Sequence, residues 1–120
     1  MSKNVVKVLD KSFSDMIAGQ KMLISSPEKI AKYINQIHLG SSKTIKEMRL
    51  DLAKSEDADN TCPLTTGIFL RKAIEELGDD LPYWRVIDEH HPLIKKLNLN
   101  PKKITKLRVA EGIKIGRAHV

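Results

Sequence analysis

Two adjacent aromatic residues stand between a proline and an arginine in the second half of the sequence. Tyr83 and Trp84 follow Pro82 directly, and Arg85 comes next. An aromatic ring can stack on an extruded base, which contributes about 1–3 kcal/mol per base. We therefore expect Pro82, Tyr83 and Trp84 to form the wall of a base-binding pocket. The alternative is that Trp84 packs in the core and Tyr83 is half-buried at the surface.

Basic and hydroxyl side chains could hold the phosphates of such a partner. The chain has 21 lysines and arginines against 15 acidic residues, a net charge of +6 at pH 7. This balance favours a polyanionic partner without identifying one. Cationic side chains release counterions from nucleic acid, and a helix N-terminus presents N–H groups to phosphate. We expect these DNA contacts: Lys43, Thr44, Lys46, Thr65, Thr66, Arg71, Lys72 and Arg85.

The other reactive residues form no catalytic or metal-binding pattern. His90 and His91 point apart on an extended chain and lack a third ligand, so we expect no metal and no cofactor. Cys62 is the single cysteine and cannot form an internal disulfide, so we expect it to be a small packed residue. The acidic pairs at 75–76 and 79–80 are expected to form a solvated patch.

The length and composition fit one folded domain. The chain has 120 residues, of which 41% are hydrophobic and 30% charged, an ordinary globular balance. No apolar run is long enough to span a membrane, and no signal peptide is evident. With a single cysteine, this favours a cytoplasmic location. We expect the protein to be a monomer. Residues 115–120 resemble a translated sequencing adapter, and we expect 114–120 to be an artefactual tail.

Capping residues and apolar periodicity predict four helices. Ser26 followed by Pro27 starts the first helix, which we expect to end at Gly40. Thr44 and Glu47 have the spacing of a capping box and start the second helix. We expect two further helices, one from Pro63 to Leu77 and one that begins at Asn100-Pro101 and ends at Gly112.

The segment from Leu81 to Asp88 is predicted to be extended. Pro82 disfavours a helical residue before it, and Val86-Ile87 favours a strand. Two helices joined by a short turn and followed by an extended piece are compatible with a winged helix-turn-helix. We therefore predict a mainly α, winged helix-turn-helix-like domain over 23–113, with a short extended wing. Residues 1–22 are expected to form an N-terminal arm or short strands.

Four features in one order resemble the DNA-binding domain of the O6-alkylguanine-DNA alkyltransferases. Ile37-His38-Leu39-Gly40 before Thr44-Ile45 resembles the start of that family's helix-turn-helix, and Asn60-Thr61-Cys62-Pro63 stands where its recognition helix begins. Leu81 to Ile87, LPYWRVI, is similar to the family's active-site stretch I-P-C-H-R-V-[VI]. Leu107 to Ile113, LRVAEGI, resembles its closing L-L-x-x-E-G-V.

The departures from this family concern its chemistry. The acceptor cysteine is replaced by Tyr83 and the following histidine by Trp84, so Glu111 would have nothing to relay to. A phenol with a pKa near 10 is a poor nucleophile. The family's non-enzymatic branch, the alkyltransferase-like proteins, also lacks the cysteine and binds O6-alkylguanine without repairing it. The resemblance therefore implies a non-enzyme that recognises alkylated guanine in double-stranded DNA by base flipping, with a possible repair-protein partner.

Two more departures keep other functions open. The family has a tyrosine near the position of Ile45 and an arginine near Thr66-Gly67, and neither residue type is present there. Arg71 lies one turn further on and could reach the groove or could be a solvated surface residue. The first alternative is a winged-helix module that binds DNA generally, or a protein, and has lost lesion recognition. A residual enzyme that uses Cys62 is the second alternative.

Overall fold

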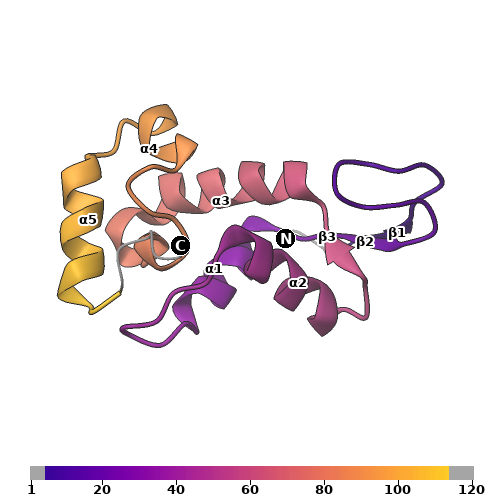
Figure 1. The fold of residues 1–120 in the computed structure, drawn as a ribbon, viewed down its shortest axis with the longest axis horizontal. Coiled ribbons are helices and arrows are strands. Elements are labelled where there is room, and N and C mark those ends of the chain that lie inside the picture. Colours follow the sequence, from indigo (N-terminus) through magenta and orange to yellow (C-terminus); the bar gives the residue numbers. More distant parts are fainter. Residues whose placement is uncertain (1–4, 114–120) are drawn as a thin grey trace.

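The computed structural model describes residues 5–113 as five α-helices, two short 3-10 turns and a small sheet. The chain is mainly α-helical, as the sequence predicts. Helix α3 runs between the sheet at the right of Figure 1 and α4 and α5 at the left. The predicted tail, 114–120, lies outside the described residues. The elements are β1 (Val5–Val8), β2 (Lys21–Ile24), α1 (Pro27–Asn35), α2 (Ile45–Ser55), β3 (Asn60–Thr61), α3 (Pro63–Leu77), η1 (Gly78–Asp80), η2 (Tyr83–Arg85), α4 (Pro92–Lys96) and α5 (Pro101–Ala110).

The predicted helix starts are confirmed because each has a local cap. The hydroxyl of Ser26 accepts a hydrogen bond from the backbone of the third helical residue at 3.1 Å. Thr44 and Glu47 form the predicted capping box, with bonds of 3.0 and 2.8 Å. Helices α3 and α5 begin at the predicted prolines, Pro63 and Pro101. These caps satisfy N–H groups that have no partner inside their own helix.

Helix α1 ends at Asn35, before the predicted end at Gly40. The backbone N–H groups of Gln36 and Ile37 bond three residues back, to Tyr33 and Ile34, which tightens and ends the helix. Gly40 lies in the following loop with φ at +88°, and a Cβ there would lie 3.0 Å from the carbonyl oxygen of Glu111. The glycine is therefore needed for a close approach to the end of α5.

The prediction of an extended segment over 81–88 is wrong. Tyr83–Arg85 forms a 3-10 turn in which the Arg85 N–H bonds to the Pro82 carbonyl at 3.1 Å. The Val86 N–H bonds to the Tyr83 carbonyl at 3.0 Å. The turn places both aromatic side chains inside the molecule, and the burial of that apolar area outweighs the local preference for a strand.

The predicted wing is also absent from the described residues. The strands among residues 5–113 lie at 5–8, 21–24 and 60–61, and none lies after residue 81. The short helix α4, which the sequence analysis did not predict, stands in that region. His91 caps it by accepting a hydrogen bond from the Leu93 N–H at 3.1 Å.

The small sheet joins the predicted arm to the rest of the domain. Strand β1 pairs antiparallel with β2, and β2 pairs parallel with β3. Strand β2 crosses the predicted boundary between residues 22 and 23, so the arm and the domain share one sheet. Met16 and Met22 pack against Cys62, which is 4% exposed and confirms the expectation of a small packed residue.

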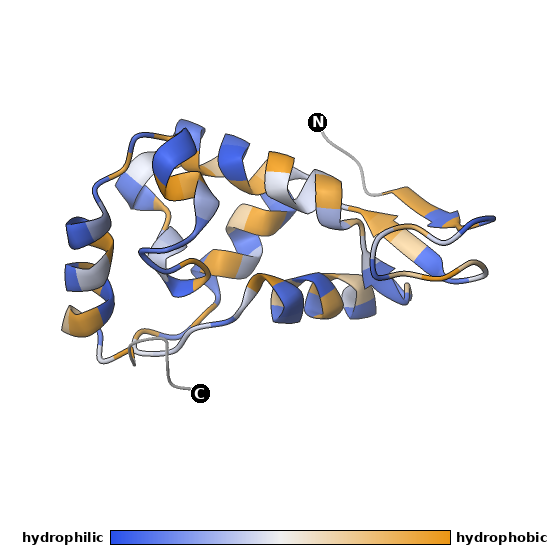
Figure 2. Ribbon diagram, turned by 45° about the horizontal axis from the view of Figure 1, so that its top comes forward, coloured by the Kyte–Doolittle hydropathy of each residue, from blue (hydrophilic) through white to orange (hydrophobic). Residues whose placement is uncertain are grey.

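The core lies between α1, α2, α3 and the segment around η2. Helix α1 packs against α3, and α5 packs on η2. Figure 2 shows hydrophobic and hydrophilic segments alternating along the helices, the pattern of helices that bury one face. The largest side chains that are almost fully buried here are Leu23, Ile30, Ile34, Met48, Leu70, Leu81, Tyr83 and Ile104.

A buried arginine on α2 holds the N-terminal region in place. The Arg49 guanidinium donates to both carboxylate oxygens of Asp15 at 2.8 and 2.7 Å. Its Nε also donates to the Thr61 carbonyl at 2.8 Å, and the Thr61 hydroxyl donates back to the Arg49 carbonyl at 2.6 Å. The hydrogen bond from Arg49 lowers the pKa of Asp15. One side chain thus links the loop before β2, helix α2 and strand β3.

Replacing Arg49 with methionine should therefore destabilise the fold. Methionine keeps much of the side-chain length but makes none of these hydrogen bonds. We expect the free energy of unfolding to fall by about 2–3 kcal/mol, since a hydrogen bond to a charged group contributes about 1.5–3 kcal/mol. Urea unfolding measures this change. Lys46→Met, at an exposed position of the same helix, should change it by less than about 0.5 kcal/mol, and an equal loss in both variants would contradict the role of Arg49.

Candidate nucleic-acid interface

Tyr83, at the predicted base-binding wall, lies in the core. It is 1% exposed, and its hydroxyl donates to Asp79 at 3.2 Å. Its ring meets that of Trp84 edge to face, with ring centroids 5.3 Å apart. Burial raises the pKa of Tyr83 to about 12, so the phenol stays protonated near neutral pH. A side chain in this position lines the core and not a surface pocket, so the expectations of a base-stacking wall and of a half-buried surface residue are both wrong.

Trp84 is also buried, at 8% exposure, which matches the alternative of core packing. Its indole N–H donates to Oε2 of Glu111 at 2.9 Å. The Arg85 guanidinium binds the same carboxylate from two nitrogens, at 2.8 Å to Oε1 and 3.0 Å to Oε2. Glu111, which the sequence analysis left without a partner, therefore holds two side chains at once.

Arg85 is consequently not a phosphate contact. Its side chain is 14% exposed and that of Glu111 is 12% exposed, so the pair is largely removed from water. The remaining guanidinium nitrogen donates to the Ile37 carbonyl at 3.0 Å. The hydrogen bond from Arg85 lowers the pKa of Glu111 and keeps it charged. The DNA-contact prediction for Arg85 is wrong because its donors are used inside the protein.

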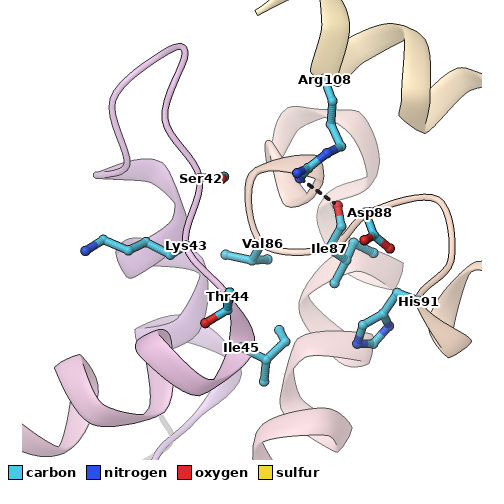
Figure 3. A pocket seen from close by; sticks show the side chains of 9 residues that line it. All are labelled: Ser42, Lys43, Thr44, Ile45, Val86, Ile87, Asp88, His91 and Arg108. Atoms are coloured by element: carbon cyan, nitrogen blue, oxygen red, sulfur yellow. Dashed lines mark hydrogen bonds between the residues drawn. The ribbon is translucent and has the colours of Figure 1, made fainter. Parts of the chain in front are cut away.

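A hollow of about 250 Å³ opens beside this cluster, between the start of α2 and the segment after η2. Figure 3 shows its lining side chains coming from these two segments, with Arg108 reaching in from α5. Arg108 donates to the carbonyls of Trp84 at 2.6 Å and Ile87 at 3.3 Å, which fixes one wall. The lining residues are Ser42, Lys43, Thr44, Ile45, Val86, Ile87, Asp88, His91 and Arg108.

The hollow combines an apolar surface with two polar groups. Ile45 and Val86 supply apolar area. Oδ1 of Asp88 accepts from the His90 N–H at 2.9 Å, and Oδ2 has no hydrogen-bond partner among residues 5–113. Burial lowers the pKa of His91, and its Nδ1 accepts from the Leu93 N–H, so its Nε2 carries the proton as a neutral donor.

The predicted phosphate contacts fall into two groups. Lys43, Thr44 and Lys46 lie exposed at the start of α2, and the first two line the hollow. Arg71 and Lys72 are exposed on α3, where Arg71 pairs with the exposed Glu75 at 3.5 Å. Lys43 pairs with Asp51 at 3.7 Å, and the Thr44 hydroxyl caps α2, so Lys46 and Lys72 are the predicted contacts that have neither an ion pair nor a capping bond among residues 5–113.

The threonine pair at the start of α3 does not suit phosphate binding. Thr66 is 1% exposed, and its hydroxyl donates to the Cys62 carbonyl at 2.7 Å. The Thr65 hydroxyl is buried without a hydrogen-bond partner among the described residues, and the Thr65 N–H points at the Cys62 sulfur, 3.5 Å away. The helix turns this pair inward, so the prediction of phosphate contacts by Thr65 and Thr66 is wrong.

A second hollow of about 350 Å³ lies between the outer face of α3 and α4. It shares His91 with the first hollow, so the two open on either side of one side chain. Its lining residues include no aspartate or glutamate. They are Pro63, Leu64, Gly67, Ile68, Arg71, His91, Pro92, Leu93 and Lys96.

The basic residues of α4 and α5 are not among the predicted DNA contacts. From Pro92 to Ala110 the chain has six cationic residues and no acidic one. The signal is visible in the sequence, because Glu111 is the only acidic residue after Glu89. Lys103 is ion-paired with Asp79, and Arg108 is bonded to carbonyls. The exposed cations that remain are Lys95, Lys96, Lys102 and Lys106.

Within 5–113, no group of three or more His, Cys, Asp or Glu residues could hold a metal ion. His90 is exposed, whereas His91 caps α4. None of the described helices has both the length and the apolar character needed to cross a bilayer.

No protein-family model, curated protein or solved structure matches the chain.

Glu111→Gln should destabilise the protein because it leaves the Arg85 charge buried without its counter-ion. Removing one partner of a buried pair costs about 3–5 kcal/mol. The pKa of Glu111 is lower in the folded protein than the ordinary glutamate value of 4.5. The contribution of this carboxylate to stability is therefore present above pH 4.5 and is lost as the pH falls through the pKa of the folded state. Urea unfolding should give the variant a free energy of unfolding well below that of wild type at pH 7. The difference between the two proteins should be smaller at pH 3.

The control for this measurement is Glu75→Gln, which removes an exposed partner of Arg71. It should change the free energy of unfolding by less than about 1 kcal/mol at either pH. A Glu111→Gln variant as stable as wild type at pH 7 would contradict the role given to the Arg85–Glu111 pair.

Proposed function

We propose that this chain is a non-enzymatic module that binds double-stranded DNA and receives an alkylated guanine, turned out of the duplex, in the first hollow. One observation carries the proposal. The hollow is lined by Thr44 and Ile45 on one side and by Val86 and Ile87 on the other. Both pairs belong to segments, 44–45 and 81–87, that resemble segments of the alkyltransferases. The sequence predicts a base site formed by Pro82–Trp84. In this proposal, the residues that follow them form the site instead.

The chemistry of the hollow suits a guanine derivative. O6-alkylation removes the N1 proton of guanine but leaves the exocyclic amino group, which is a hydrogen-bond donor. The Asp88 carboxylate can accept from that group, because Oδ2 has no other partner among the described residues. Ile45 and Val86 can contact the ring faces. Turning a base out costs a few kcal/mol, and less when the lesion already weakens pairing, so the pocket selects damage.

Alkyl transfer has no place in this proposal. The acceptor position is Tyr83, whose phenol is buried and has a raised pKa. Cys62 is 4% exposed and packs with Met16 and Met22, apart from the cluster that contains Tyr83 and Trp84. A thiol needs exposure and a nearby positive group or base to react.

In this proposal α2 and α3 act as a helix-turn-helix, with α3 as the recognition helix and α4 in place of a wing. Lys43 and Lys46 at the start of α2 and Lys95 and Lys96 on α4 are exposed, and Lys43 and Lys96 each line one of the two hollows that share His91. Such cations neutralise phosphates, so the affinity must fall steeply as salt rises.

A second candidate function is DNA binding without lesion preference. It is favoured by the burial of Tyr83 and Trp84, which removes the aromatic surface on which a base could stack. Ile45 stands where the alkyltransferase family has a tyrosine, which also favours DNA binding without lesion preference. Both candidates share the cationic surface and differ only in the use of the first hollow.

The test is a fluorescence-anisotropy titration of two matched duplexes, one with a single O6-methylguanine. We expect at least tenfold tighter binding of the damaged duplex, which corresponds to about 1.4 kcal/mol. Equal binding that weakens with salt would support the second candidate, and binding of neither duplex would contradict both.

Asp88→Asn tests the base site directly. The change keeps the shape of the side chain but removes the carboxylate charge, so the lesion preference should fall at least threefold. Affinity for the undamaged duplex should stay the same or rise. The matched control is Glu89→Gln, which removes the same charge one residue away, outside the hollow. If Asp88→Asn leaves the lesion preference at its wild-type value, the assignment of this hollow is wrong.

A further inference from the structure

The outer face of α3 exposes two large apolar side chains. Leu64 is 63% exposed and Ile68 is 53% exposed. They are four residues apart, so they lie on one face of the helix, while Leu70 and Ile74 are buried on another. Single apolar residues are common on protein surfaces, whereas neighbouring ones beside a hollow are typical of an interaction site. We call Leu64 and Ile68 the α3 ridge.

The α3 ridge lines the second hollow, whose surface is mostly apolar. Six of its nine lining residues are apolar or glycine, and they come from both α3 and α4. A Cβ at Gly67 would meet no atom within 4 Å, so the space beside this glycine is open. The exposed Pro92 and the buried Leu93 line the α4 side. An apolar side chain of a partner can therefore enter between the two helices.

The charges at this hollow select an anionic partner. Arg71 and Lys96 are the charged residues among its lining residues, none of which is acidic. Lys95 is exposed next to Lys96 on α4. The ion pair of Arg71 with Glu75 is exposed and lies within one helix, and a pair of this kind contributes little to stability. A carboxylate of a partner can therefore replace Glu75 beside Arg71.

The walls of the hollow also restrict the form of the partner. None of the strands among residues 5–113 lines it, so it offers no open sheet edge to which an extended peptide could add. A helix satisfies its own backbone hydrogen bonds and can lay an apolar face into a groove. A phosphate backbone could pair with the cations, but it would leave the α3 ridge against a polar surface.

We propose that the second hollow and the α3 ridge bind an acidic amphipathic helix of a partner protein. Apolar residues of that helix, spaced by three or four positions, contact Leu64 and Ile68. Its glutamates or aspartates pair with Arg71 and Lys96. This site does not depend on the proposed function. The proposed function brings duplex DNA to the same face of α3, so the duplex and the partner helix would exclude each other there.

The test is a fluorescence-anisotropy titration of the full chain, without DNA, against a panel of labelled synthetic peptides of about four helical turns. Each peptide has leucines on one helical face and glutamates beside them. One set of control peptides has lysine in place of glutamate, and another has the same composition with the leucines spread around the helix. We expect the acidic amphipathic peptides to bind about tenfold more tightly than either control set, and to bind less tightly as salt rises.

Two double variants locate the binding site. Leu64→Ala/Ile68→Ala removes the apolar contact, and Arg71→Gln/Lys96→Gln removes the charges. Each should weaken binding of the acidic peptides at least fivefold, and only the second should reduce the salt dependence. Because all four side chains are exposed, these changes leave the core intact.

The matched controls change residues that do not line this hollow. Leu39→Ala/Val109→Ala removes two exposed apolar side chains, and Lys7→Gln/Lys54→Gln removes two exposed positive charges. Both controls should bind the acidic peptides as wild type does.

Three results would overturn the proposal. The first is that no acidic peptide binds, or that acidic and lysine peptides bind equally. The second is that the α3-ridge variant binds the acidic peptides as wild type does. The third is that the chain associates with itself in sedimentation experiments and that Leu64→Ala/Ile68→Ala abolishes this association, which would assign the ridge to a second copy. Failure of the chain to bind either duplex would contradict the proposed function and leave peptide binding unaffected.

Discussion

The buried ion pair between Arg85 and Glu111 is the interaction on which the arrangement of this domain depends. It joins η2 to the end of α5, and Arg85 also donates to the Ile37 carbonyl, two residues after α1 ends. Trp84 binds the same carboxylate, and Lys43 donates its backbone N–H to the Arg85 carbonyl at 2.9 Å. A buried pair of this kind adds little net stability over an apolar core, but breaking it is costly. Its main effect is to fix where the chain segments meet.

The first hollow follows from that junction. The bond from Lys43 sets the start of α2 beside the segment after η2, and Arg108 ties the same segment to α5. The second hollow follows from the turn that leads into α4, where His91 is both the helix cap and the side chain shared by the two spaces. This region thus combines a pocket that has apolar side chains and a carboxylate with the exposed Leu64 and Ile68 of α3 and the exposed cations Lys95 and Lys96 of α4.

Features that depend on neighbouring residues could be predicted from the sequence, whereas those that depend on distant contacts could not. The starts of α1, α2, α3 and α5 follow from Ser26, Thr44 and two prolines, because a cap acts within one helical turn. The conformation of 81–88 was mispredicted because the burial of Tyr83 outweighs local strand propensity. The sequence predicts a phosphate contact at Arg85 because the carboxylate that binds this arginine lies 26 residues away. Helix α4 has five residues, too few for a periodic pattern.

We propose that one surface, made of the start of α2, the segment from Val86 to Lys96 and the outer face of α3, binds duplex DNA. The most direct test is a titration of isotope-labelled protein with a damaged duplex, followed by backbone amide NMR shifts. We expect the largest shifts at 42–46, 86–96 and the first half of α3, with little change in β1. Shifts confined to β1 and the loop before β2, or no shifts at all, would contradict it.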